Sequence, residues 1–398
     1  MKLVELPAWC ELPSVELTAE QAAAIERDGL ADVLVGASPG LWRVKTSSAV
    51  GVVVGDDWEL RVTPRLAIPR LMFLLGYASD PSGWRSFVAG FERERDLVSA
   101  IASGFASLTT RALDRGLLRG YVGREERRVA PRGRVLFGRQ AAISRGLPLP
   151  VEVAYDDFTE NILENRMLKA AALLVSRLPR LPSIARRNLH RIRELLDEVE
   201  PLQAVRGIKA PPITRLNQSY AAALPLAELI LSHASVGERK GGIKSTTFVF
   251  DMNKVFEDFV TVAFRDAMRA YGGSVQSQVK PFSLDESGRL KLKPDLSWRS
   301  AGQCLAVLDA KYKAIGDGLM KHDDAYQMLA YCVSCALPRG YLVYAQNSGA
   351  ESRVHKIRNL DCQIVVSAID VSSEPEDVLA QIAELAEQVA VEATLVPA

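Results

Sequence analysis

The sequence has few of the features that identify several common protein classes. Its 398 residues include only four histidines, and none of them has the HxH, HxxxH or Ser-His-Asp spacing of a metal site or a hydrolase triad. No run of eighteen apolar residues occurs, so no membrane-spanning helix is expected. A Gly-Lys-Ser/Thr phosphate-binding loop is also missing, and any nucleotide hydrolysis would have to come from another chain.

Cysteine is scarce as well, with five residues at positions 10, 304, 332, 335 and 362. Cys332 and Cys335 form a CxxC motif, but a structural zinc site needs four ligands and the other cysteines are single and distant. We therefore expect packed helical thiols. The first thirteen residues contain Glu5 and Glu11 and no long apolar core, which argues against a secretory signal and favours a cytoplasmic protein.

The formal net charge is only +1, so the overall charge gives no argument for nucleic-acid binding. The stretch Arg111 to Arg145, in contrast, contains ten arginines, no lysine and three acidic residues. Guanidinium groups could bind phosphates or an acidic protein surface here, or form a solvated face. The candidates for contact with DNA or a partner are Arg124, Arg127, Arg128, Arg132 and Arg134.

A hairpin in the last third of the chain brings charged residues together. The segment Arg289 to Trp298 alternates apolar and polar residues, whereas Cys304 to Leu308 is a continuous apolar run typical of a buried strand. If the chain reverses at Gly302, Asp295 lies opposite Asp309, and the two-residue period places Lys311 on the same face as Asp309. Two carboxylates and an amine would then meet at one end of the hairpin.

These groups fit phosphodiester cleavage. Asp295 and Asp309 offer hard oxygens to Mg²⁺, and the carbonyl of Ala310 offers a third. Lys311 could orient the attacking water or stabilise the developing charge. Without other evidence, an Asp-x-Lys at a strand end is more often a solvated pair.

Two helices could add to this site. Asp251 is placed to cap a helix whose apolar stripe leaves Glu257 at its margin, where the side chain could join the metal shell or remain an ordinary surface glutamate. A second helix, Asp323 to Leu337, carries Gln327 and Tyr331 four residues apart on one face.

The order Glu257, Pro294-Asp295, Asp309-Ala310-Lys311 and Gln327-xxx-Tyr331 resembles the PD-(D/E)xK nuclease superfamily, and its last element is similar to the RecB-like branch. Further stretches resemble the McrC family, the nuclease subunit of McrBC-type modification-dependent restriction systems. The resemblance spans roughly residues 50 to 345. These stretches are Ile68 to Met72 with Leu75 to Tyr77, Arg119 to Tyr121 with Arg132 to Arg134, Asn161 to Leu168, and Phe256 to Val260.

This resemblance implies an α/β fold with a PD-(D/E)xK restriction-endonuclease-like core, in which helices flank a mixed central sheet. Upstream of it we expect a β-containing and helical partner-binding region, because Ser48 to Val54 and Trp58 to Thr63 predict a β-hairpin. The expected domains are a β-containing module over residues 1–105, an arginine-rich, mainly helical region over 106–240 and the nuclease domain over 241–398.

The resemblance also implies roles for the site residues. Asp295 and Asp309 would bind Mg²⁺, or Mn²⁺ as a substitute, with Ala310 and Glu257 completing the shell. Lys311 would be catalytic. Gln327 and Tyr331 would face DNA or orient the metal.

The function implied is an Mg²⁺-dependent DNA endonuclease subunit of a restriction or defence complex. Its partner would be an McrB-type AAA+ GTPase hexamer, which it stimulates and which alone uses GTP, and its substrate would be duplex DNA containing modified cytosine. Two alternatives remain: an autonomous RecB-like repair nuclease, and a non-catalytic scaffold that holds DNA or a motor. The intact Asp295, Asp309 and Lys311 argue against the scaffold.

Overall fold

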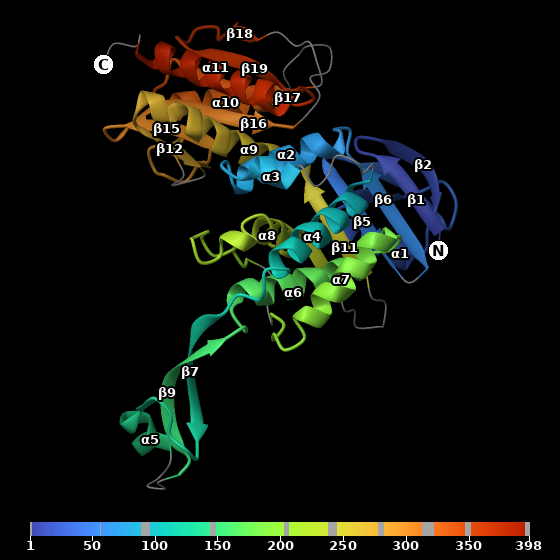
Figure 1. Ribbon diagram of the computed structural model, residues 1–398. Coiled ribbons are helices and arrows are strands. Elements are labelled where there is room, and N and C mark those ends of the chain that lie inside the picture. Colours follow the sequence, from blue (N-terminus) through green and yellow to red (C-terminus); the bar gives the residue numbers. More distant parts are fainter. Residues whose placement is uncertain are drawn as a thin grey trace. The chain divides into compact units, whose positions relative to one another are not determined.

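The computed structural model describes residues 2–55, 57–88, 96–143, 149–202, 207–237, 245–277, 282–312, 322–346 and 352–394 (Figure 1). The chain forms two compact units, one made of Met1–Ala100 with Val236–Ala398 and one made of Ile101–Ser235. The last of the three expected segments and all of the first except residues 101–105 thus belong to one compact unit. The division into three domains stays a prediction.

The N-terminal part of the first unit is built on β-strands. Strands β5 and β6 form the predicted hairpin, and β11 pairs antiparallel with β5 although the two lie far apart in sequence. A smaller sheet has the order β2-β4-β3. Strands and their bounds are β1 (Lys2–Pro7), β2 (Glu11–Glu16), β3 (Ala31–Val35), β4 (Leu41–Thr46), β5 (Ala49–Val54), β6 (Trp58–Thr63) and β11 (Ser245–Asp251). Strand β10 (Ala234–Gly237) spans the division between the units.

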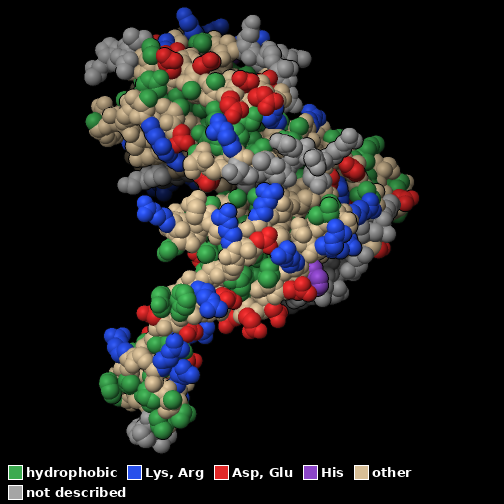
Figure 2. Space-filling model, in the orientation of Figure 1, with side chains coloured by type: hydrophobic (Ala, Val, Ile, Leu, Met, Phe, Trp, Pro, Cys, Tyr) green, Lys and Arg blue, Asp and Glu red, His purple; other side chains and the backbone are tan. Residues whose placement is uncertain are grey.

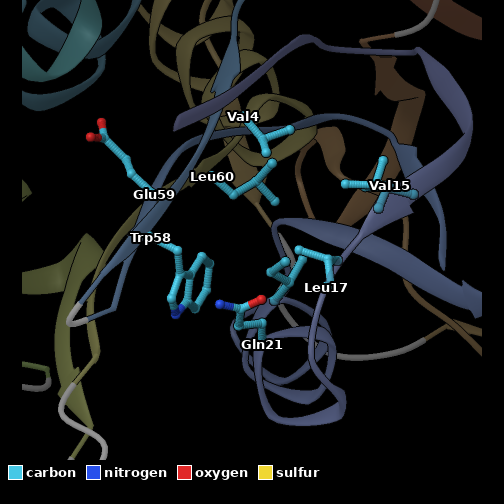
Figure 3. Close-up of a pocket in the computed structure, with 9 residues that line it drawn as sticks. Val4, Val15, Leu17, Gln21, Trp58, Glu59 and Leu60 are labelled. Atoms are coloured by element: carbon cyan, nitrogen blue, oxygen red, sulfur yellow. The ribbon is translucent and has the colours of Figure 1, made fainter. Parts of the chain in front are cut away.

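Helix α1 (Ala19–Arg27) packs against β3 in this part of the unit. Its N-terminus has a capping box, in which the Thr18 side chain accepts from the Gln21 amide and the Gln21 side chain accepts from the Thr18 amide. A cavity of only about 10 Å³ remains beneath it, lined by apolar side chains such as Val15 and Trp58 (Figure 3). A space for about one water-sized sphere is too small for a ligand.

The C-terminal part of the first unit contains a six-stranded mixed sheet in the order β12-β15-β16-β17-β19-β18. Its central strands β16, β17 and β19 are parallel, whereas the flanking pairs are antiparallel. The strands are β12 (Ser274–Ser277), β15 (Leu296–Ser300), β16 (Gln303–Lys311), β17 (Arg339–Gln346), β18 (Arg353–Lys356) and β19 (Gln363–Asp370). The chain is therefore a mixed α/β protein. Two short strands, β13 (Phe282–Ser283) and β14 (Lys291–Leu292), pair beside this sheet.

Helices cover both faces of this sheet. On β17, the Tyr341 hydroxyl donates to Glu392 of α11 (Pro375–Thr394), and the Tyr344 hydroxyl donates to Asp324 of α10 (His322–Cys335). Because residues of opposite parity on a strand point to opposite faces, α10 and α11 lie on opposite sides. Helix α9 (Met252–Ala267) packs with α11, and Asp251 caps it by accepting from the Asn253 amide, as predicted.

An aromatic cluster joins the two parts of the first unit. Helix α2 (Ile68–Ser79) packs against α9, where the Phe73 and Phe259 rings meet edge to face at 5.3 Å. Helix α3 (Trp84–Val88) adds the Trp84 ring, 4.9 Å from Phe73. Helix α4 (Leu97–Leu113) continues from this unit into the second, and η2 (Met268–Tyr271) follows α9.

The second unit combines a helical body with a long β-ribbon (Figure 1). Buried Asn165 links them, since its Nδ2 donates to the carbonyls of Leu118 and Glu160 and its Oδ1 accepts from the Tyr220 hydroxyl at 2.8 Å. The ribbon consists of β7 (Gly120–Arg128), β8 (Arg134–Val135), α5 (Phe137–Ile143) and β9 (Val151–Thr159), and the body of α6 (Leu163–Val175), α7 (Ser183–Leu195), η1 (Gln218–Tyr220) and α8 (Ala223–His233). None of the helices in the described ranges is long and apolar enough to cross a membrane.

Candidate active site

The β15–β16 hairpin has the register that the sequence predicted at its open end, although its turn differs. Ala301 and Gly302 form the reversal with φ values of 47° and 84°, and Ser300 pairs with Gln303. This turn is centred half a residue earlier than expected. A register shift between Trp298 and Arg299 compensates, so that Leu296 pairs with Leu308. Continued by one residue beyond β15, this register places Asp295 opposite Asp309.

Asp295, Asp309 and Lys311 converge at this end of the hairpin. Lys311 Nζ lies 2.5 Å from Asp309 Oδ2, and the Ala310 amide donates to Asp295 Oδ2 at 2.9 Å. Asp309 is only 1% exposed, whereas the Lys311 side chain is 18% exposed. The strand thus holds a buried carboxylate and an amine that reaches the surface. Ala310 contacts Asp295 through its amide N–H. Metal binding by the Ala310 carbonyl stays a prediction.

Burial favours the protonated form of both carboxylates. Burial, followed by the charges of Asp309 and Glu257, raises the pKa of Asp295 to about 7. Burial also raises the pKa of Asp309, although Lys311 acts in the opposite sense. Two buried carboxylates this close favour a shared proton near neutral pH unless a cation replaces it.

Lys311 remains a cation in this setting. Burial lowers the pKa of its ammonium, but the surrounding carboxylates Asp309, Asp295 and Asp324 together raise it above the ordinary value. A protonated lysine cannot accept a proton from water. Its chemistry in this site is therefore electrostatic and hydrogen-bond donating.

Helix α10 is tied to the hairpin through a chain of hydrogen bonds. Lys311 Nζ donates to Gln327 Oε1 at 3.3 Å, and Gln327 Nε2 donates to the Tyr331 hydroxyl at 2.7 Å. Tyr331 in turn donates to the carbonyl of Lys293, two residues before Asp295. Gln327 is exposed, as a DNA-facing residue requires. Tyr331 is 2% exposed and its hydroxyl is used within the chain, so its position suits the predicted orienting role better than contact with DNA, and that role stays a prediction.

A further carboxylate, Asp324, belongs to this site and was not predicted. It is buried in the first turn of α10 and accepts from the Tyr344 hydroxyl at 2.8 Å. Its charge acts on both Asp309 and Lys311. Only the packing of α10 against β17 reveals this position, although Asp324 lies three residues before Gln327, one turn away on the same helix face.

Glu257 acts on Asp295 through its charge. That charge raises the pKa of Asp295, and Glu257 Oε1 lies 3.3 Å from Lys254 Nζ. Among the described residues, no three His, Cys, Asp or Glu side chains are grouped as a metal site. Glu257 as a third ligand therefore stays a prediction.

Asp295 and Asp309 nevertheless fit a hard cation. Oδ2 of Asp309 is buried and, within the described part of the chain, accepts no hydrogen bond beyond the ion pair with Lys311. Mg²⁺ in nucleic-acid enzymes is typically held by one or two carboxylates, with water and substrate phosphate supplying the rest. A pair of carboxylates is thus a sufficient protein contribution.

The arginine-rich stretch lies on the β7–β9 ribbon, where acidic residues offset its charge. Asp157 Oδ2 lies 3.2 Å from Arg124 Nε, and Asp157 Oδ1 lies 3.3 Å from Arg132 Nη1. Arg127 pairs with Glu152 at 3.1 Å. Figure 2 shows acidic side chains among the basic ones on this ribbon. Further ion pairs on it join Arg128 to Glu126 and Arg139 to Glu125, and Arg134 is exposed.

A comparison with models of protein families assigns this chain to a family. A family model described as "McrBC 5-methylcytosine restriction system component" matches residues 44–345, which is more than half of the sequence. The chain belongs to the McrBC restriction-component family. A comparison with curated protein sequences finds no match.

A solved structure of an McrBC assembly contains a chain with this fold. The chain resembles one from an assembly of Thermococcus gammatolerans McrB AAA+ hexamers with bound McrC, with 17% identity, a TM-score of 0.56, and coverage of 96% of this chain and 100% of that one. A chain of the Thermococcus gammatolerans McrBC complex is 18% identical over 67% of this chain and 88% of its own length, with a TM-score of 0.41.

Proposed function

We propose that this McrBC-family chain is a metal-dependent endonuclease with a PD-(D/E)xK core, whose active site is built on Asp295, Asp309 and Lys311. The observation that carries the proposal is the buried Asp309 carboxylate, in contact with Lys311 Nζ at 2.5 Å and opposite Asp295 in the hairpin register. Buried carboxylates with raised pKa values are typical of functional sites rather than of stabilising surface pairs.

In this proposal each residue has a distinct task. Asp295 and Asp309 would hold Mg²⁺ or Mn²⁺, which neutralises phosphate charge and lowers the pKa of water when bound. Lys311 donates to a phosphate oxygen or to the attacking water, because its ammonium stays charged. Gln327 orients Lys311, and Tyr331 holds Gln327 and the segment before Asp295 in place.

We further propose that an McrB-type AAA+ GTPase hexamer activates cleavage and is stimulated by this chain. The solved assembly that shares the fold contains McrB hexamers with bound McrC. The ribbon supports a protein partner, since Tyr121 and Phe158 are 76% and 53% exposed with their rings 5.1 Å apart. GTP would enter only through the partner, and the complex would act in the cytoplasm on duplex DNA containing modified cytosine.

The test is a cleavage assay on methylated and unmethylated duplex DNA with Mg²⁺, with and without the McrB-type partner and GTP. Wild type is compared with Lys311→Met, which keeps the length of the side chain but loses its charge. We expect partner-dependent cutting of methylated DNA that disappears in Lys311→Met. The exposed Lys356→Met is the matched control and should cut like wild type.

The other outcomes distinguish the alternatives. Equal cutting without the partner would favour an autonomous repair nuclease. If wild type and Lys311→Met both bind the partner but neither cuts DNA under any metal or nucleotide condition, a scaffold is favoured.

A further inference from the structure

Four of the five cysteines lie together in or against the hydrophobic core between α10 and the mixed sheet. Cys332 and Cys362 belong to the hydrophobic core there, and Cys304 and Cys335 pack against it. The sequence predicted packed thiols for the CxxC motif, which this cluster confirms. It did not predict that Cys304 of β16 would join them. All five cysteines are free thiols.

The thiols form two pairs, and each pair joins residues outside the CxxC spacing. Cys304 of β16 and Cys335 of α10 pack against the same core and each shifts the pKa of the other, and Cys332 and Cys362 do the same within that core. Cys304 and Cys335 are half-buried, whereas Cys332 and Cys362 are buried. A small oxidant in solution therefore reaches the first pair more easily than the second.

The surroundings make the members of the first pair chemically unequal. The neighbouring Cys335 thiol, followed by the positive charge of Arg299, lowers the pKa of Cys304 against the effect of burial. Arg299 is the cross-strand neighbour of Cys304 in the hairpin. The proximity of Cys304, followed by burial, raises the pKa of Cys335. One cysteine is suited to react as a thiolate and the other to resolve the product.

We propose that Cys304 and Cys335 are an oxidant-sensitive pair that closes to a disulfide with hydrogen peroxide. The Cys304 thiolate attacks one peroxide oxygen, the O–O bond breaks, and a sulfenic acid and hydroxide result. The Cys335 sulfur then attacks the Cys304 sulfur, and its proton leaves with the displaced hydroxide as water. Two thiols lose two electrons in total, and the peroxide is reduced to two waters. A dithiol reductant restores the pair by exchange.

The disulfide would join β16, which bears Asp309 and Lys311, to α10, which bears Gln327. Oxidation would thereby fix the two elements whose contact orients Lys311. The proposal rests on the thiol pair alone. It stands or falls independently of nuclease activity.

The experiment is peroxide treatment of the full chain, alkylation of the remaining thiols, and peptide mapping with trypsin without reduction. Cys304 falls in the tryptic peptide 300–311 and Cys335 in the peptide 322–339. We expect these two peptides to be linked and three of the five thiols to remain. Dithiothreitol should release the link.

Cysteine variants identify which two thiols are linked. Cys304→Ala and Cys335→Ala should each abolish the link. Cys332→Ala and the distant Cys10→Ala should retain it. A link that survives in Cys335→Ala but disappears in Cys332→Ala would overturn the pairing, and so would oxidation confined to the peptide 322–339. Loss of all five thiols at equal rates would overturn the proposal itself.

Discussion

The Tyr344 hydroxyl donates a 2.8 Å hydrogen bond to Oδ2 of Asp324, and both side chains are buried between β17 and α10. This bond holds a negative charge that acts on Asp309 and Lys311 without being part of the hairpin that carries them. Buried carboxylates without a function are uncommon because their desolvation is unfavourable. Asp324 therefore qualifies as a positioning residue of the proposed site.

Asp324→Asn tests this role. Asparagine keeps the shape and can still accept from Tyr344, but it removes the charge that helps to hold the Lys311 ammonium. We expect normal folding and a cleavage rate lower by about 10-fold to 100-fold, the usual effect of changing a residue that orients a metal site. The neighbouring Asp323 is exposed, so Asp323→Asn makes the same charge change outside the site. Equal rates for the two variants would remove Asp324 from the mechanism.

A second prediction concerns the pH dependence of stability without metal. The Asp295 pKa of about 7 in the folded chain exceeds the ordinary value of 3.8, so the folded state binds this proton more tightly than the unfolded state does. The stability contributed by Asp295 is thus fully present below about pH 3.8 and is lost as the pH rises to about 7. Thermal unfolding in EDTA from pH 5 to pH 8 should show this loss, and Asp295→Asn should reduce it.

The same proton opposes metal binding. Because Mg²⁺ must displace it, we expect the apparent Mg²⁺ affinity to fall about tenfold per pH unit below pH 7 and to level off above it. Isothermal titration calorimetry at several pH values measures this directly. The exposed Asp361→Asn is the control for both experiments and should behave like wild type. A flat affinity profile between pH 6 and pH 8 would contradict the shared proton.

A third prediction follows from the close contact between β17 and α10. A Cβ atom on Gly340 would lie 2.4 Å from Met328 Sδ and 2.6 Å from Cys332 Sγ, both in the buried core. Gly340→Ala should therefore push α10 outward and lower the free energy of unfolding by about 1–3 kcal/mol. Urea denaturation measures the effect. Gly138→Ala, whose Cβ would meet nothing within 4 Å, should change stability little.

A compensating substitution makes this test specific. Met328→Ala removes the sulfur that the new methyl group would meet, so the double variant Gly340→Ala/Met328→Ala should be less unstable than the sum of the two single changes. Additive effects would indicate that Gly340 matters for another reason.

The sequence predicted the proposed site better than it predicted its surroundings. The two-residue alternation of strands placed Lys311 beside Asp309, and the turn residues near Gly302 placed Asp295 opposite it. That register came out right because the shift at Trp298 offsets the earlier turn. Neither the shift nor the turn centre has a local sequence pattern strong enough to fix it.

Features that depend on packing between distant segments could not be read from local patterns. Asp324 reaches the site only because α10 lies on β17, and Tyr331 is buried for the same reason. Within the sequence, the arginine stretch has few acidic neighbours, but Glu152 and Asp157 come from β9, which pairs with β7 across the ribbon. Charge balance in a sheet depends on cross-strand neighbours, which follow from register and not from composition.

This charge balance leads to the last prediction. Because Asp157 and Glu152 already engage Arg124, Arg132 and Arg127, these guanidinium groups are less available to DNA phosphates than the sequence suggested. We expect Arg124→Glu/Arg132→Glu to weaken binding to the proposed McrB-type partner and to leave the salt dependence of DNA binding unchanged. If these arginines did bind phosphates, removing each one would reduce the slope of log affinity against log salt by about 0.9.

Arg186→Glu on α7 is the matched control, since it reverses an exposed arginine outside the ribbon. It should leave partner affinity, measured by fluorescence anisotropy or calorimetry, at the wild-type value. If the ribbon variant instead loses salt-dependent DNA affinity and keeps partner binding, the ribbon is a phosphate-binding element, and its ion pairs open when DNA arrives. If neither affinity changes, the arginines form a solvated face, and the exposed Tyr121 and Phe158 become the next candidates for partner contact.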